Sequence, residues 1–342
     1  MSNITIGEAT YTCQPDETVL DTLLRENIQI PNGCRQGICQ SCLMRSLDKS
    51  PPVSAQRGLK DTLQKQNYFL ACMCHPEQDM SVALPDQQRV LIEASVIRKQ
   101  FLSADIVRVV LQYQGEFNFF AGQFINLQRP DGLMRSYSIA NIPACDNTLE
   151  FHIRRLPNGQ FSAWAYDELK TGTPLILSEA QGSCHYLPGK SEQPLLLIGT
   201  GSGLAPLYGI ITDALTQKHS GNIHLFHGSR DINGLYLMDE MRELAAKFEN
   251  FNYTPCLSGA DVAAEFAKGR VHDVALASTQ SLKGWRVYLC GHPEMVNQTK
   301  KMAYLKGASL SDIYADAFHV TQTNLPLQKS RSEPVNRLSY SL

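Results

Sequence analysis

Residues 34–42 read CRQGICQSC, and the three cysteines of this loop follow the spacing C-x4-C-x2-C. That spacing is typical of thiolate ligands to a [2Fe-2S] cluster, which accepts one electron at a time. Small and flexible residues between the cysteines let backbone N–H groups turn toward the sulfur atoms, and Gly37 is the residue that we least expect to be replaceable. We therefore predict that Cys34, Cys39 and Cys42 are cluster ligands.

Two later cysteines, Cys72 and Cys74, compete to be the fourth ligand. Here residues 1–85 resemble the plant-type ferredoxins, whose third and fourth ligands are separated by the same 29 residues that separate Cys42 from Cys72. The interval from Cys42 to Cys74 is two residues longer. The resemblance therefore implies that Cys72 is the ligand and that this segment has a β-grasp fold.

Two considerations bear on this cluster assignment. Gln40 stands where the ferredoxins more often have a small residue, which alters hydrogen bonding near the cluster. Four thiolates also bind structural zinc. The spacing fits the paired C-x2-C motifs of zinc ribbons poorly, so we favour the iron–sulfur cluster over zinc.

The composition indicates a protein of a reducing compartment. The chain has ten cysteines in 342 residues and a polar start without a signal-peptide core, so we expect reduced thiols and a cytoplasmic location. The densest apolar run, residues 195–198, is too short to span a membrane. A net charge of −2 provides no basic field for nucleic acid. We expect protein and small-molecule partners, and a monomer.

The middle of the chain is rich in short β segments separated by turn residues, which predicts an antiparallel barrel. The predicted strands are residues 90–97, 106–111, 123–127, 136–139 and 149–154. Alternation along a strand places Arg135 and Tyr137 on one face. Ser136 and Ser138 then lie on the other face.

With the flanking segments 122–124 and 159–162, this strand resembles the flavin-binding barrel of the ferredoxin–NADP reductase superfamily. The resemblance implies that Arg135 contacts a flavin phosphate, Tyr137 packs on the isoalloxazine and Ser138 approaches its reactive edge. The bound flavin is then expected to be FAD.

The resemblance extends to Gly159 and Ser162, which open a predicted helix over residues 161–169. Free N–H groups at a helix start suit a pyrophosphate. The family usually has a Gly-Pro-x-Gly element after the barrel, and this chain keeps only its second glycine, Gly182.

Residues 194–206 read PLLLIGTGSGLAP, a buried-strand pattern followed by a glycine-rich turn and a helix. This is a phosphate-binding arrangement, although neither the dinucleotide fingerprint nor a P-loop fits. It resembles the nicotinamide domain of the same superfamily. The resemblance implies that Gly199, Gly201 and Gly203 pass close to the pyridine dinucleotide.

A second predicted strand, residues 222–227, leads to Arg230 and Asp231, where cofactor choice is usually made. An acidic residue suits the ribose hydroxyls of NAD, and an arginine suits the 2′-phosphate of NADP. The chain offers both, so the choice between NADH and NADPH stays open.

Residues 287–295 resemble the loop beside the nicotinamide in that family, which implies that Cys290 and Gly291 lie at the hydride-transfer site. A buried structural thiol is the commoner state of a free cysteine. Residues 313–318 resemble the family's closing segment, which implies that Phe318 covers the flavin.

Together these resemblances predict a multidomain α+β and α/β enzyme. We expect a ferredoxin domain over residues 1–88, an FAD-binding antiparallel barrel over 89–190 and a doubly wound, parallel NAD(P)-binding domain over 191–320. The remaining residues, 321–342, are expected to form a mobile tail.

The same domain order resembles the reductase components of bacterial multicomponent oxygenases and the reductases of deoxysugar dehydratases. It implies electron flow from NAD(P)H through FAD and the [2Fe-2S] cluster to a partner protein, for which an oxygenase or hydroxylase is our leading hypothesis. The alternatives are a deoxysugar-pathway reductase, a flavin or ferric reductase, and a non-enzymatic metal-binding module.

Overall fold

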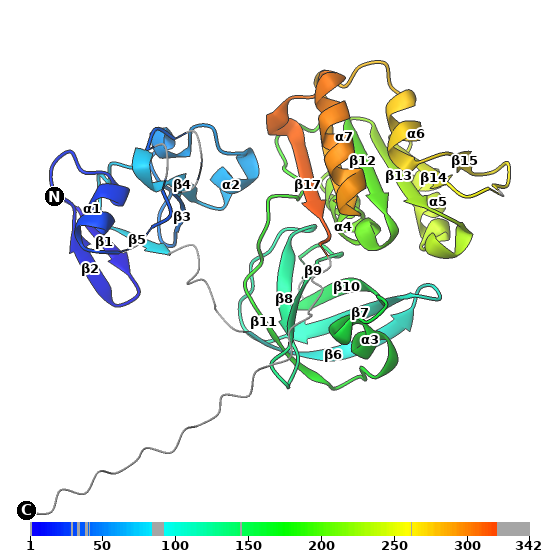
Figure 1. Ribbon diagram of the computed structural model, residues 1–342, viewed down its shortest axis with the longest axis horizontal. Helices are drawn as coiled ribbons and strands as arrows, with labels where there is room; N and C mark the ends of the chain where they lie inside the picture. Colours follow the sequence, from blue (N-terminus) through cyan, green and yellow to red (C-terminus); the bar gives the residue numbers. More distant parts are fainter. Residues whose placement is uncertain are drawn as a thin grey trace, which may run out of the picture.

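The described residues of the computed structural model form three β-sheets that follow one another along the chain (Figure 1). The structure describes residues 2–28, 30–32, 35–37, 40, 42–83, 92–143, 146–260 and 262–319. The predicted tail and two of the predicted ligands, Cys34 and Cys39, lie outside the described residues. No helix in the described ranges is long and apolar enough to cross a membrane.

The N-terminal domain is a mixed five-stranded sheet in the order β2-β1-β5-β3-β4. The strands are β1 (Asn3–Ile6), β2 (Ala9–Thr12), β3 (Leu43–Ser46), β4 (Tyr68–Leu70) and β5 (Met80–Ala83), and the helices are α1 (Val19–Arg25) and α2 (Asp61–Lys65). A capping box between Thr18 and Asp21 begins α1, whose buried Leu20 and Leu23 pack in the same core as Ile4 and Phe69. The arrangement agrees with the predicted ferredoxin fold.

The second domain is an antiparallel barrel in the order β10-β7-β6-β11-β8-β9. Its elements are β6 (Ile92–Phe101), β7 (Ile106–Tyr113), β8 (Phe124–Gln128), β9 (Met134–Ser138), β10 (Thr148–Arg154), α3 (Gln160–Asp167) and β11 (Pro174–Leu177). A bridge between Ile139 and Phe151 joins the two ends of the sheet and closes it. The predicted barrel is confirmed, while α3 begins one residue earlier and ends two residues earlier than predicted.

The third domain is a six-stranded parallel sheet in the order β15-β14-β13-β12-β16-β17. Its strands are β12 (Leu195–Thr200), β13 (Ile223–Ser229), β14 (Phe251–Leu257), β15 (Ala267–Lys268), β16 (Arg286–Gly291) and β17 (Ile313–Ala317), and its helices are α4 (Leu204–Thr216), α5 (Met238–Lys247), α6 (Val271–Ala277) and α7 (Pro293–Leu305). Residues of α4 and α5 pack in one core and residues of α6 and α7 in another, so the sheet is doubly wound as predicted.

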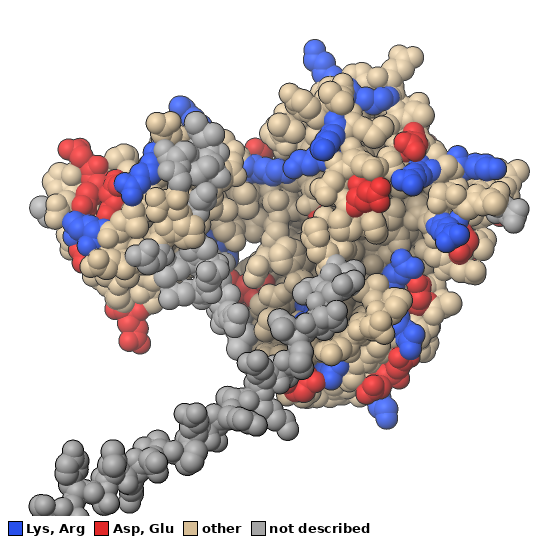
Figure 2. Space-filling view, in the orientation of Figure 1, with Lys and Arg blue, Asp and Glu red and all other residues tan. Residues whose placement is uncertain are grey.

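The strand order reverses between β12 and β16, and ligands bind at the carboxyl ends of strands at such a point. The barrel lies beneath this edge, and the N-terminal domain lies beside β17 (Figure 1). In the space-filling view, the N-terminal and third domains touch, and basic and acidic side chains are interspersed on the visible face (Figure 2).

Candidate functional site

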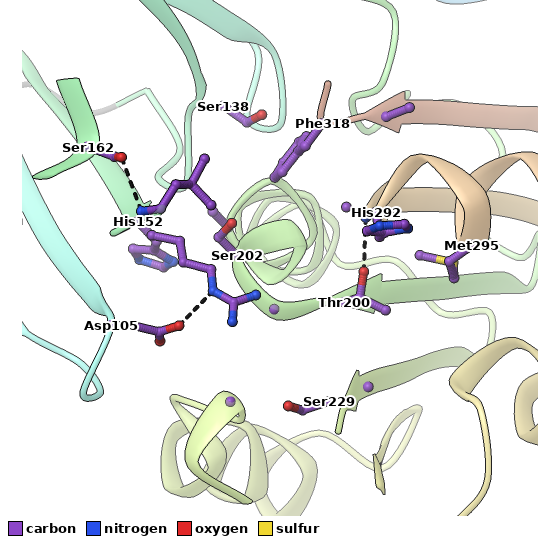
Figure 3. Close-up of a pocket in the computed structure, with 18 of the residues that line it drawn as sticks. Asp105, Ser138, His152, Ser162, Thr200, Ser202, Ser229, His292, Met295 and Phe318 are labelled. Atoms are coloured by element: carbon purple, nitrogen blue, oxygen red, sulfur yellow. Dashed lines mark hydrogen bonds and ion pairs between the residues drawn. The ribbon is translucent and has the colours of Figure 1, made fainter. Parts of the chain in front are cut away.

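A cleft of about 1230 Å³ opens between the barrel and the carboxyl edge of the parallel sheet (Figure 3). It exceeds the roughly 300–1,000 Å³ that is common for a single small-molecule site, so it has room for more than one ligand. Most of the residues that the sequence singled out line it. They are Arg135, Tyr137, Ser138, Gly159, Ser162, Gly201, Arg230, Gly291 and Phe318.

On the barrel side, β9 contributes Arg135, Tyr137 and Ser138, and the intervening Ser136 also lines the cleft. The Tyr137 ring lies 5.3 Å from that of Phe161, and burial raises the pKa of its hydroxyl, so the tyrosine is a neutral, largely apolar wall. The guanidinium of Arg135 donates to the carbonyl of Met134 at 2.7 Å.

A carboxylate that the sequence analysis missed lies opposite Ser138. The Ser138 hydroxyl donates to Oδ2 of Asp316 at 2.9 Å, which joins the barrel to the end of β17. Burial raises the pKa of Asp316, so its carboxyl holds a proton more readily than an exposed aspartate does. The available signal was an acidic residue two positions before Phe318, inside a segment already assigned to the site.

The start of α3 forms the next part of the wall. Gly159 is the N-cap of α3 without a side-chain cap, so its first N–H groups are available to an anion. Ser162 accepts from the Leu156 N–H at 3.2 Å and donates to the Gly159 carbonyl at 3.3 Å. A Cβ on Gly159 would lie 2.3 Å from the Ser162 hydroxyl oxygen, so a larger residue here would force Ser162 to rotate out of these two bonds.

The three glycines of the turn that we predicted to lie near the dinucleotide have two different roles. Gly201 lines the cleft in the left-handed region, with φ of +52°. Gly199 and Gly203 do not line it. A Cβ on Gly203 would lie 2.3 Å from the carbonyl oxygen of Cys290, which shows that Gly203 lets two backbone segments pack together.

Cys290 lies behind the cleft. Its side chain is fully buried, burial raises the pKa of its thiol, and its sulfur is 3.7 Å from that of Cys184. The cleft is lined instead by the following residues, Gly291 and His292, and the His292 N–H donates to the hydroxyl of Thr200 at 3.0 Å (Figure 3). A chemical role for the Cys290 thiol stays a prediction.

At the other end of the cleft, Arg230 and Asp231 follow β13, and both line the cleft together with Arg270. The Asp231 carboxylate accepts from the Asn233 N–H at 3.0 Å, so it is already engaged in capping a short 3-10 turn. Arg230 and Arg270 both border this end of the cleft, so it can attract an anionic group.

The described part of the cluster site supports Cys72 over Cys74. Cys42 comes just before β3 and Cys72 just after β4, and the Cys42 carbonyl accepts from the Ala71 N–H at 3.0 Å. Both cysteines are therefore at one end of the same strand pair. Cys74 is fully buried, and burial raises the pKa of its thiol to about 12.

Gly37 and Gln40 of the cluster loop are both in the left-handed region, with φ of +75° and +57°. A Cβ on Gly37 would lie 3.0 Å from Cγ of Met73, so the loop packs closely on the segment that carries Cys72. The Gln40 side-chain amide donates to the Gly58 carbonyl at 3.1 Å, and so the larger residue at this position ties the loop to the rest of the domain.

Three family models match the chain in the order of its domains. They describe a 2Fe-2S iron-sulfur cluster binding domain at residues 4–77, an oxidoreductase FAD-binding domain at 93–186 and an oxidoreductase NAD-binding domain at 197–301. The residues present fit these groups, because the cleft joins cationic side chains, a free helix start and a glycine-rich turn, while Cys42 and Cys72 meet at one end of the first sheet.

Relatives match over almost the whole chain. The reductase subunit of the aromatic O-demethylase of an Amycolatopsis species is 32% identical, over 92% of this chain and 98% of the relative. The ferredoxin–NAD(P)+ reductase component of a naphthalene 1,2-dioxygenase system of Pseudomonas putida is 31% identical, over 87% and 92%. The crystal structure of the Amycolatopsis cytochrome P450 reductase GcoB is 30% identical, with a TM-score of 0.65 over 93% of this chain and 99% of that one. The chain therefore belongs to the three-domain [2Fe-2S], FAD and NAD(P)H reductases of the ferredoxin–NADP reductase superfamily.

Proposed function

We propose that this reductase passes electrons from NAD(P)H through FAD and the [2Fe-2S] cluster to an oxygenase or hydroxylase component. The observation that carries the proposal is the shared cleft, which brings the barrel strand β9, the glycine-rich turn and the end of β17 together. Relatives that align over almost all of their own length are named as the reductase parts of an aromatic O-demethylase and of a naphthalene 1,2-dioxygenase system, which supports the choice of acceptor.

The flavin is held mainly by the barrel. Arg135 supplies positive charge for its phosphates, and the start of α3 supplies N–H donors. Both line the cleft. The neutral ring of Tyr137 packs against the flavin ring. Phe318, whose N–H donates to the Gly291 carbonyl at 2.8 Å, closes the opposite side.

When bound, FAD accepts two electrons as a hydride from the nicotinamide and releases them singly, which matches a one-electron cluster. Ser138 and Asp316 handle the proton at this place. Burial raises the pKa of Asp316, so its carboxyl takes up a proton more readily than an exposed aspartate does. Once protonated, Oδ2 donates to the Ser138 oxygen, and the Ser138 hydroxyl in turn donates to a ligand atom that becomes negative.

The nicotinamide dinucleotide binds on the sheet side. Gly201 and Gly291 have no side chains and line the cleft, so a ring and a pyrophosphate can approach the backbone there. Arg230 contacts the adenosine end. Cys290 and Gly203 support this wall from behind, and the Cys290 thiol is our remaining candidate for a group beside the reacting ring.

An anaerobic titration of the purified holoprotein with NADH, and separately with NADPH, tests the electron path. Bleaching of both the flavin and the iron–sulfur absorption bands is expected. A colourless protein, or bands that neither nucleotide changes, would refute the proposal.

Arg135→Ala tests the flavin site. We expect loss of FAD and of ferricyanide reduction, because a phosphate ligand is removed. Unchanged FAD content would show that the flavin is not held by Arg135. Turnover of a purified aromatic oxygenase component, compared with reduction of free flavin or ferric iron, tests the acceptor. Faster reduction of the small molecules would favour a flavin or ferric reductase.

A further inference from the structure

All three domains of this chain meet around one buried imidazole. His185 lies in the connection between β11 and β12 and is fully buried. Its ring stacks on Phe120 of the barrel domain, with centroids 4.4 Å apart and planes 9° apart. Its carbonyl accepts from the Tyr288 hydroxyl of β16 at 3.1 Å, and its Nε2 lies 3.2 Å from the side-chain nitrogen of Gln66 in the N-terminal domain.

The hydrogen-bond partners fix the direction of the contact between His185 and Gln66. Nδ1 lies 3.1 Å from the Tyr186 carbonyl, which can only accept, so Nδ1 carries the hydrogen and Nε2 is an acceptor. Burial lowers the pKa of His185 to about 4, which keeps the ring neutral. The Gln66 amide nitrogen is therefore the donor across the domain boundary.

The Gln66 side chain also accepts a hydrogen bond from the barrel domain. Its carbonyl oxygen accepts from Nε2 of Gln123 at 2.8 Å, and Gln123 is almost fully buried in the barrel domain. Gln123 also donates to the Gly182 carbonyl at 3.1 Å and accepts from the Phe120 N–H at 2.8 Å. The Gln66 amide nitrogen also donates to the Thr62 carbonyl of its own domain at 2.9 Å and, across the boundary, lies 3.3 Å from the Gly182 carbonyl. The donor and the acceptor of one amide thus both contact the barrel domain, which specifies orientation as well as contact.

Gln66 follows the C-terminal end of the short helix α2, and the N-terminal end of α2 has its own contact with the sheet. Lys60, the N-cap of α2, lies over the Tyr314 ring at 4.5 Å and donates to the carbonyl of Ile313 in β17. Both ends of α2 therefore contact residues outside the N-terminal domain. From Gln66 the chain runs through β4 to Cys72, only six residues away.

We propose that Gln66 is a positioning residue, whose bonds to His185 and Gln123 hold the [2Fe-2S] domain in the docked position that flavin-to-cluster electron transfer requires. This inference rests on the proposed function. Without Gln66, Nε2 of the buried His185 loses this donor in the docked state, and the Gln123 amide nitrogen keeps only its bond to the Gly182 carbonyl. The docked fraction and the rate of cluster reduction therefore fall, while hydride transfer from NADH to the flavin is unaffected.

The test compares Gln66→Ala with Gln64→Ala in the same helix, because the Gln64 side chain donates to the Leu59 carbonyl inside its own domain. Anaerobic stopped-flow mixing with NADH separates flavin bleaching from cluster bleaching. In Gln66→Ala we expect an unchanged first phase and a second phase slowed about tenfold, equivalent to ~1.4 kcal/mol in docking. Gln66→Glu, which cannot donate to His185, should slow it at least as much.

Hydrogen exchange supplies a readout that does not depend on turnover. Amides of residues 120–123 and 182–186 should exchange faster in Gln66→Ala than in Gln64→Ala, with or without nucleotide. If both variants match the wild type in exchange and in the second phase, the positioning role is refuted. If the wild-type cluster is not reduced by NADH at all, the proposed function fails, and the exchange comparison still decides whether Gln66 holds the domain.

Discussion

Gly203→Ala tests the structural reading of the glycine-rich turn most directly. Gly203 has φ of −62°, which alanine adopts freely, so any effect of the substitution must come from steric contacts of the new methyl group. The new Cβ would lie 2.3 Å from the carbonyl oxygen of Cys290 and 2.9 Å from Cα of Gly291. Both are backbone atoms that cannot rotate away, and reaching the 3.4 Å of ordinary contact requires a displacement of about 1 Å.

The expected cost of this overpacking is about 1–3 kcal/mol of stability in the nucleotide-binding domain. A misplacement of about 1 Å at a reacting pair costs about a hundredfold in rate, and we expect kcat/KM for NADH to fall by that order. Ferricyanide is the acceptor of choice, since it can draw electrons from the flavin. FAD content should stay at the wild-type level.

Gly199→Ala is the matched control within the same turn. Its Cβ would lie 2.8 Å from Cδ1 of Leu207, the end of a flexible side chain, and 3.3 Å from the nearest backbone atom. A leucine terminus can move, so we expect a loss below about 1 kcal/mol and kcat/KM within about threefold of wild type. Equal effects of the two alanines, or a milder effect at Gly203, would refute the reasoning.

Four further substitutions separate the functions of the domains. Cys72→Ser should spare ferricyanide reduction, which draws electrons from the flavin, and stop cytochrome c reduction, and equal loss of both activities contradicts electron flow through the cluster. Cys74→Ser should keep the absorption of the cluster. Asp316→Asn keeps an acceptor for Ser138 and should slow flavin bleaching by NADH. Because burial raises the Asp316 pKa, the contribution of this residue to stability falls as the pH rises from 3.8 through the raised pKa. Over that range the variant's melting temperature should fall less than the wild type's, and parallel profiles contradict this. Arg230→Gln should raise KM for NADPH several-fold more than KM for NADH, and equal changes contradict a role at the 2′-phosphate.

The fold was accessible from the sequence because each domain has a strong local pattern. The alternating strands of the barrel and the apolar run that became β12 depend on near neighbours alone, and the structure confirms both. The boundaries were less accurate, since β6 continues to Phe101, beyond the predicted residue 97. A strand's end depends on what it pairs with, and β7 keeps pairing with β6 after a bulge at residues 96–98.

The site was predicted where a residue's type is itself informative. Arg135, Tyr137 and Gly201 line the cleft, as the sequence led us to expect. The sequence could not show whether Gly203 and Cys290 line the cleft or lie behind it. It shows that a glycine or a cysteine is present, but not which segment packs against that residue. Both residues lie behind the wall.

Contacts between domains were beyond sequence reasoning altogether. Gln66 and His185 are 119 residues apart, and each alone is an ordinary polar residue beside a helix or in a loop. Ser138 and Asp316 are 178 residues apart. Pairs of this kind arise from the packing of complete domains, so no local period or motif marks them.

The strand β17 connects the docking contact to the cofactor cleft. Its first residues, Ile313 and Tyr314, contact Lys60 of the N-terminal domain, and Asp316 near its end lines the cleft. Five register pairs hold β17 on β16, among them Cys290 with Asp316. These pairs run along the whole of β17, so β16 holds the strand in place whether or not α2 is docked on its first residues. The N-terminal domain therefore docks on a rigid edge of the same structure that encloses the flavin and nicotinamide sites, so changes at α2 should affect cluster reduction rather than flavin reduction.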